Sequence, residues 1–370
     1  MTKKNDNAPL VLSVYSHKGG VGKTSLVHAI GELNLPSTVH AGTLHRNRIL
    51  MIDLDTQMNL TAKILGNEES FDNYFKSIHP LHNLTPHDIT RDIKDVRSKL
   101  TRVTNIAAMR CADQMNALNP NPIIVHSRLV DGEEAKEAKE TTDGTPILHL
   151  IPGSPDFYLL ARQMELELQD KNSAINYCGA ISLLIKYYHS KFNYDLVILD
   201  LGPDLYSFNC VALWSSDYIL SPCGLDIYST MSFYLMRERI FPSPGRFEHQ
   251  HPYYRMNSRL KMLGFLPNKV KTISESLTMT DQQAITMLED RFMANLSTYL
   301  YRPNPHFCNL PDHLASHPCW IKLITASVVV PNQTKSWNAL KYCQDTERRV
   351  IYQNMTMLVD WLNYTLGAPV

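Results

Sequence analysis

The chain has 370 residues, which is enough for one large domain or two modest ones. Hydrophobic residues make up 44% and charged residues 19%, as in globular proteins with a sizeable core. The 36 basic residues balance the 36 acidic ones, so overall charge excludes a strongly basic nucleic-acid-binding chain and leaves only local basic faces. The seven cysteines form no C-x-x-C pair, which argues against a disulfide framework or a zinc site.

The N-terminal residues are polar and lack the apolar core of a signal peptide. No apolar run approaches the length of a membrane span. We therefore expect a cytoplasmic protein without a membrane span.

The most informative stretch runs from Ser16 to Thr24 and is rich in glycine. It follows an apolar run at 10–15, which predicts a buried strand, and it precedes a helix-compatible segment at 25–33. Strand, glycine-rich turn and helix in this order are typical of a phosphate-binding loop. Glycines let backbone N–H groups turn inward around an anion, and the helix adds its positive dipole end.

The loop residues have distinct expected roles. Lys23 would meet the β- and γ-phosphates, and the Thr24 hydroxyl would hold Mg²⁺. A glycine-rich turn without a ligand is the weak alternative, because few structural turns need three glycines and two lysines so close together. We expect the nucleotide to be bound by Gly19, Gly20, Val21, Gly22, Lys23, Thr24 and Ser25.

The string Lys-Gly-Gly-x-Gly-Lys-Thr, from Lys18 to Thr24, departs from the plain pattern, with His17 at the first glycine position. It resembles the deviant Walker A loop of the ParA/MinD family of P-loop ATPases, most closely the ParA/Soj-type partition ATPases. The resemblance implies ATP and Mg²⁺ as cofactors and a homodimer that encloses ATP. Lys18 would then cross the dimer interface to the partner's nucleotide, and Lys18 and Lys23 would both be catalytic.

A second block, 53–59, reads Asp-Leu-Asp-Thr-Gln-Met-Asn and follows an apolar strand at 49–52. Carboxylates at the end of a parallel strand lie at the edge where α/β sheets bind ligands. The block resembles the family's Asp-x-Asp-Pro-Gln-Gly-Asn, with Thr56 for proline and Met58 for glycine.

By this resemblance Asp55 would orient the attacking water and Asp53 would support the Mg²⁺ shell. Hydrolysis needs an acceptor near the water and negative charge near the metal. Either aspartate alone could instead cap the following helix.

A third block, Tyr194 to Asp200, is an apolar strand that ends in a carboxylate. It resembles a Walker B strand, whose terminal aspartate, here Asp200, would hold Mg²⁺. The following Leu201-Gly202-Pro203 is close to the family's Asp-x-x-Pro. A further strand at 262–268 ends in Asn268, and the resemblance implies that this residue contacts the nucleotide base.

Other apolar segments alternate between strands and helices. We expect strands at 147–151, 218–222 and 320–330, and helices at 173–192, 209–214, 280–299, 332–343 and 346–366. This alternation predicts an α/β fold with a doubly wound, mostly parallel sheet, and a single P-loop ATPase domain over residues 1–370. The last helix has an apolar stripe, but no lysine or arginine follows Arg349, so packing onto the sheet is favoured over membrane targeting.

Residues 66–145 do not resemble the family core. Helical spacing at 88–103 and a charged run at 133–140 predict an insertion that is partly helical, with an exposed charged loop or short helix.

The region from Arg237 to Lys271 is locally basic, with eight basic residues against two acidic ones. The basic residues are Arg237, Arg239, Arg246, Arg255, Arg259, Lys261, Lys269 and Lys271. Such a face could bind DNA phosphates without reading sequence, or it could simply be a solvated surface.

Together these features favour a ParA-like ATPase that partitions or positions a plasmid, a chromosome or other cargo. Its ATP-bound dimer would bind DNA, and a partner protein would stimulate hydrolysis. A MinD-like adaptor ATPase that recruits a protein machine without touching DNA is the main alternative. A metabolic P-loop ligase or synthetase that shares the deviant loop is a third.

Overall fold

The computed structural model describes part of the chain. The described residues are 8–34, 48–65, 123–124, 147–153, 180–205, 207–241, 260–268, 272–273, 276–277, 279–301 and 346–366. The elements expected at 88–103, 320–330 and 332–343, the charged run at 133–140 and most of the predicted insertion lie outside these ranges.

The described strands form one seven-stranded sheet and one small pair. The large sheet contains β1 (Leu10–Val14), β2 (Arg48–Asp53), β3 (Ile123–Ile124), β4 (Ile147–Ile151), β5 (Leu196–Asp200), β6 (Tyr218–Gly224) and β7 (Lys261–Asn268), and the separate pair is β8 (Thr272–Ile273) with β9 (Ser276–Leu277). The order in the large sheet is β3-β4-β2-β5-β1-β6-β7. All its pairings are parallel except that of β3 with β4. The predicted fold class is therefore confirmed, and residues 123–124 of the insertion supply the antiparallel edge strand.

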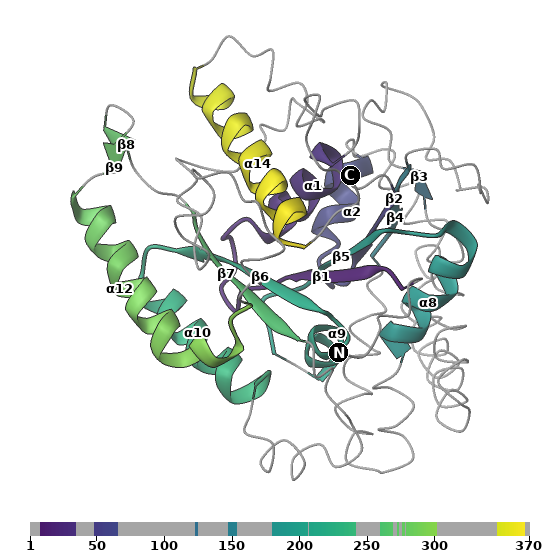
Figure 1. Ribbon diagram of the computed structural model, residues 1–370, viewed down its shortest axis with the longest axis horizontal. Coiled ribbons are helices and arrows are strands. Elements are labelled where there is room, and N and C mark those ends of the chain that lie inside the picture. Colours follow the sequence, from purple (N-terminus) through teal and green to yellow (C-terminus); the bar gives the residue numbers. More distant parts are fainter. Residues whose placement is uncertain are drawn as a thin grey trace, which may run out of the picture.

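Helices cover both faces of the sheet (Figure 1). The apolar cluster on one face contains residues of α1 (Lys23–Leu33), α2 (Asn59–Leu65) and α14 (Thr346–Thr365). The cluster on the other face contains residues of α8 (Ala180–Phe192), α9 (Ser207–Trp214), α10 (Ile227–Arg239) and α12 (Met279–Leu296), which continues into the 3-10 turn Ser297–Tyr299. This is the doubly wound arrangement.

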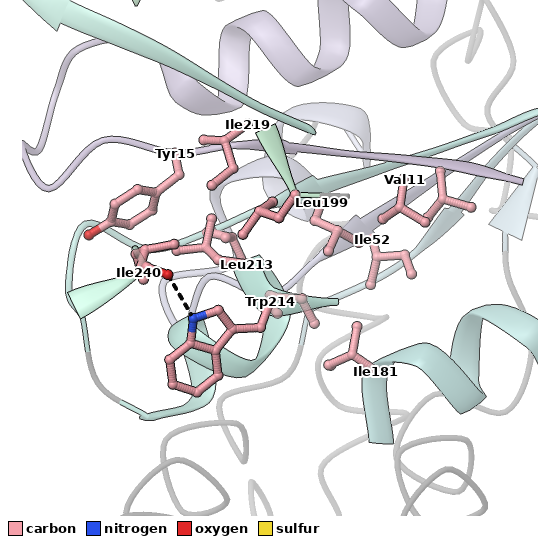
Figure 2. Packing of buried hydrophobic residues seen from close by; sticks show 14 of the residues in the cluster. Val11, Tyr15, Ile52, Ile181, Leu199, Leu213, Trp214, Ile219 and Ile240 are labelled. Atoms are coloured by element: carbon pink, nitrogen blue, oxygen red, sulfur yellow. Dashed lines mark hydrogen bonds between the residues drawn. The ribbon is translucent and has the colours of Figure 1, made fainter. Parts of the chain in front are cut away.

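The central strands are apolar on both faces because both faces are covered. In β1, Leu12 packs into the α1 and α14 cluster, whereas Val11 packs into the opposite one. Figure 2 shows part of this second cluster, where the indole N–H of Trp214 donates to the carbonyl oxygen of Ile240 (3.2 Å). That bond satisfies the polar group of a fully buried side chain.

The C-terminal helix α14 packs as its apolar stripe predicts. Met355, Leu358, Val359 and Leu362 are buried in the same cluster as α1. The stripe is thus part of the core. None of the helices in the described ranges is long and apolar enough to cross a membrane.

Candidate nucleotide-binding site

Three predicted motifs meet at one edge of the sheet because β1, β2 and β5 are neighbours. In the strand register, Asp200 at the end of β5 lies beside both Val14 of β1 and Asp53 of β2. The glycine-rich loop that follows β1 therefore lies next to the two carboxylate blocks. Parallel sheets bind ligands at this edge.

The loop after β1 has the backbone of an anion-binding turn. Gly20 (φ 70°) and Gly22 (φ 89°) are in the left-handed region that favours glycine. Gly22 caps α1, and its carbonyl oxygen accepts from the Leu26 N–H (2.9 Å). A Cβ added at Gly19 or Gly20 would meet no atom within 4 Å, so this part of the loop borders open space.

Lys23 is buried, with 7% of its surface exposed. Its ammonium donates to the backbone carbonyl oxygens of Ser16 (3.1 Å) and Lys18 (2.9 Å). Burial lowers the pKa of Lys23, and the charges of Asp200, Asp55 and Asp204 oppose this shift. Carboxylates of the turn after β2 and of the end of β5 with its following loop thus lie around one lysine.

Asp200 is fully buried, and neither of its carboxylate oxygens has a hydrogen bond of normal geometry to the described residues. Burial raises its pKa well above the usual value, and the charge of Asp53 adds to the shift. The nearby Thr24 hydroxyl and Lys23 act in the opposite direction. A buried carboxylate without a donor beside a threonine hydroxyl fits Mg²⁺.

Within the described ranges, no group of three or more His, Cys, Asp or Glu side chains could hold a metal by itself. Asp200 and the Thr24 hydroxyl fit Mg²⁺ bound as part of a nucleotide complex, because proteins bind this ion through one or two carboxylates together with substrate phosphates.

Unlike Asp200, Asp53 accepts hydrogen bonds with both of its carboxylate oxygens. One oxygen accepts from the Thr61 N–H (2.8 Å) and Thr61 hydroxyl (2.6 Å), and the other accepts from the Asp55 N–H (3.2 Å). The Thr61 oxygen in turn accepts from the Gly153 N–H (2.7 Å). Asp53 thus links the ends of β2 and β4 to α2, and its predicted contribution to the Mg²⁺ shell stays a prediction.

Asp55 lies in the turn between β2 and α2. Its two oxygens accept from the Gln57 N–H (3.0 Å) and the Asn59 side-chain amide (3.0 Å). A Cβ at Gly202 would approach Oδ1 of Asp55 to 3.3 Å, so the loop after β5 passes close to this carboxylate. Met58 in the same turn has φ 53°, which explains why the resembled motif has glycine there.

Lys18 is held within its own chain. Its ammonium pairs with Asp226, the residue that caps α10, and lies 6.0 Å from the centre of the Tyr228 ring. A Cβ at Gly224 would come within 2.8 Å of the Asp226 carboxylate and 3.1 Å of the Lys18 ammonium, so glycine leaves room for the pair. The loop is also tied to α10 where the His17 N–H donates to Ser232 (3.1 Å).

Asn268 lies at the end of β7, buried against the glycine-rich loop. Its side-chain amide donates to the carbonyl oxygen of Val21 (2.5 Å). This bond braces the loop, whereas the base contact implied by resemblance stays a prediction.

Of the eight basic residues in the region from Arg237 to Lys271, the structure describes three. Arg237 and Arg239 are exposed in the last turn of α10, where Arg237 lies 3.9 Å from Glu238, and Lys261 of β7 is half-buried. The other five basic residues, Arg246, Arg255, Arg259, Lys269 and Lys271, lie outside the described ranges.

Sequence reasoning missed several residues that the fold brings to the site. Asp226 and Asp204 are distant from the motifs along the chain, and Thr61 and Lys63 have the appearance of ordinary helix residues. The sequence Asp226-x-x-Ser229 is an N-cap pattern and could have indicated the start of α10.

Comparison with known proteins agrees with this geometry. The family described as AAA domain matches residues 10–240, which is more than half of the chain. An uncharacterized protein of Methanocaldococcus jannaschii is 25% identical over 260 residues, 70% of this chain and 73% of the relative.

Two solved structures share the fold. The structure of pnob8 ParA has a TM-score of 0.55 at 17% identity, covering 98% of this chain and 100% of its own. A cobyrinic acid a,c-diamide synthase from Mycobacterium smegmatis, with bound ATP analogue and magnesium, has a TM-score of 0.50 at 15% identity, covering 97% of both chains. With the loop and the two carboxylate blocks, these findings identify the chain as a member of the AAA domain family, with the fold and deviant Walker A loop of the ParA/MinD P-loop ATPases.

Proposed function

We propose that this protein hydrolyses ATP, dimerises in its ATP-bound form and partitions or positions a cargo by binding DNA without sequence preference. The observation that carries the proposal is the buried Asp200 carboxylate, which lies near Lys23 and Thr24 at the end of the glycine-rich loop and has no hydrogen bond of normal geometry to the described residues. A buried carboxylate that lacks a donor is costly unless a bound cation compensates it.

Each residue of the site has a role in this proposal. Backbone N–H groups from Gly19 to Ser25 bind phosphate oxygens, and Lys23 leaves its carbonyl partners to meet the β- and γ-phosphates. Thr24 and Asp200 would hold Mg²⁺, which would supply positive charge next to the phosphates. Asp55, held by two hydrogen bonds, orients the attacking water.

Lys18 is the residue on which the proposed ATP-dependent dimer depends. Its charge would stabilise the partner's nucleotide, so ATP links two copies and hydrolysis lets them separate. Reaching that position requires Lys18 to leave Asp226. A partner protein that stimulates hydrolysis would set the lifetime of the dimer.

A second candidate is an adaptor ATPase that recruits a protein and does not bind DNA. It is favoured by a row of exposed apolar side chains on α10, which begins beside Lys18. These are Ile227 (67% exposed), Tyr228 (72%), Met231 (51%) and Tyr234 (46%). Exposed apolar rows of this kind are typical of protein-binding surfaces.

The first experiment is a nucleotide-binding measurement on Lys23→Ala. We expect the variant to lose ATP binding, because the charge that meets the β- and γ-phosphates is removed. Lys186→Ala, an exposed lysine of α8 on the other face of the sheet, is the matched control. Equal ATP affinity of Lys23→Ala and the parent would reject the assignment of the loop.

A second experiment separates the two candidate functions. The parent protein is passed over immobilised duplex DNA of unrelated sequences with ATP, ADP or no nucleotide, at two salt concentrations. The partition role predicts retention with ATP alone that falls steeply with salt, with a log–log slope of about −0.9 per phosphate contacted. Hydrolysis without retention at either salt would favour the adaptor.

A further inference from the structure

A third lysine, Lys63, contacts the first turn of α1, directly after the glycine-rich loop, although no motif points to it. It belongs to α2, and its ammonium donates to the Ser25 hydroxyl oxygen (3.0 Å). Ser25 is the third residue after Gly22 and the third of α1. Lys63 therefore reaches the start of the helix that would face the phosphates.

The surroundings of Lys63 do not neutralise it. Within the described ranges, Ser25 is its hydrogen-bond partner, and no carboxylate lies within 4.0 Å of its ammonium. Burial lowers the pKa of Lys63 to about 8, and the more distant charges of Asp200 and Glu32 oppose the shift. Lys18 differs, because it has a carboxylate partner.

The hydrogen bond leaves unused donors on both groups. An ammonium has three N–H donors, of which one is used by Ser25 among the described residues. A hydroxyl that accepts from an ammonium still has its own O–H to donate. Both groups can therefore donate to an anion bound at the beginning of α1, where backbone N–H groups also lack intrahelical partners.

The position along the loop indicates which part of a nucleotide is contacted. Lys23 would meet the β- and γ-phosphates and Thr24 would hold the metal, whereas Ser25 lies one residue further on, where the α-phosphate would follow. We propose that Lys63, together with Ser25, forms an additional binding site for the α- and β-phosphates of the bound nucleotide. This inference rests on the proposed nucleotide-binding function.

The alternative is that Lys63 only ties α2 to α1. Thr61 of the same helix already links α2 to β2 through Asp53. A purely structural tie predicts a less stable protein with unchanged nucleotide affinity. A phosphate contact predicts weaker nucleotide binding in a protein of unchanged stability.

The test measures MgATP and MgADP affinity by calorimetry for the parent and for Lys63→Met, which keeps the apolar stem and removes the charge. The α- and β-phosphates are common to both nucleotides, so we expect both dissociation constants to rise by the same factor, about tenfold to a hundredfold. Turnover at saturating ATP should change little, so the effect falls on KM and not on kcat. Lys186→Met is the control with no expected effect.

Two further variants keep the test decisive. Lys63→Arg retains the charge and should recover most of the affinity. Ser25→Ala combined with Lys63→Met should weaken binding by less than the product of the single effects, because the two residues act as one unit. Thermal unfolding without nucleotide shows whether each variant folds. If Lys63→Met does not fold, the nucleotide affinities of Lys63→Arg and Ser25→Ala are compared with that of the parent instead.

The outcomes are distinguishable. Unchanged affinity in a folded Lys63→Met would overturn the inference while the parent still binds nucleotide. A loss confined to ATP would also overturn it, because Lys63 would then serve the γ-phosphate. A parent that binds neither nucleotide would reject the proposed function itself.

Discussion

At the scale of single residues, the pairing of Lys18 with Asp226 sets a condition on the proposed dimer. A lysine that serves the partner's nucleotide cannot at the same time neutralise a carboxylate of its own chain. Asp226 therefore competes with the partner for Lys18. Although burial acts in the opposite direction, the hydrogen bonds from Lys18 and Ser229 hold the pKa of Asp226 below its usual value.

Replacing Asp226 by Asn should release Lys18 and strengthen ATP-dependent dimerisation. Asn is as good a helix cap as Asp, so α10 should be preserved while the charge is lost. About a third of each paired side chain is exposed, so the gain should be modest, roughly twofold to fivefold in the dimer dissociation constant. Sedimentation across a concentration series with ATP measures it.

The matched control is Asp290→Asn, which removes an exposed carboxylate from α12. It should leave the dissociation constant at the parent value. Weaker dimerisation of Asp226→Asn than of this control would mean that Asp226 supports the dimer instead of competing with it.

At the scale of elements, the strands that carry the site could be predicted because their motifs are local. Strands β1, β2 and β5 are short apolar runs, each followed directly by polar site residues. Helix α10 was missed because its pattern is inverted: Ser229 and Ser232 are buried, while Tyr228 and Met231 are exposed. Hydrophobic periodicity cannot reveal a helix that buries polar residues against a loop.

The contacts of the site were also hidden from the sequence. Lys18 and Asp226 are 208 residues apart, and Lys63 and Ser25 are 38 apart. Only the strand order, which places β5 and β6 beside β1 and β2 on the far side of β5, brings these segments together. Residues within the motifs could therefore be predicted, whereas those that reach the loop from other elements could not.

Strand β4 supplies a prediction about pH. His149 is buried, and its Nδ1 lies 2.7 Å from the Tyr194 hydroxyl. Burial, followed by the charge of Arg48, lowers the pKa of His149 to about 4. The unfolded chain takes up a proton near pH 6.5 and the folded chain does not, so the free energy of unfolding should fall as pH decreases from about 6.5 to 4.

For this one group the loss should reach about 3 kcal/mol. His149→Gln should reduce the slope of unfolding free energy against pH, as measured by urea titration between pH 7.5 and 4.5. His189→Gln, which replaces a less buried histidine on α8, should leave the slope as in the parent. A slope that is equal in the parent and His149→Gln would contradict the assigned titration.

At the scale of the whole molecule, the fold gathers three lysines and several carboxylates around the glycine-rich loop and the first turn of α1. Lys23 lies where the loop meets α1, Lys63 reaches Ser25 of α1 from α2, and Lys18 pairs with the residue that caps α10. Fold alone does not fix what such a site does, since pnob8 ParA and a cobyrinic acid a,c-diamide synthase have the same fold. The proposed function differs from other activities on this fold in one respect: Lys18 would stabilise the nucleotide bound by a second copy of the chain.

The most direct test of this claim is the molecular mass in solution of the parent and Lys18→Ala with MgATP, MgADP or no nucleotide. We expect the parent to be a dimer with ATP and a monomer with ADP or without nucleotide. Lys18→Ala should bind ATP and remain a monomer. A parent that stays monomeric with bound ATP, or a Lys18→Ala variant that dimerises as the parent does, would contradict the account.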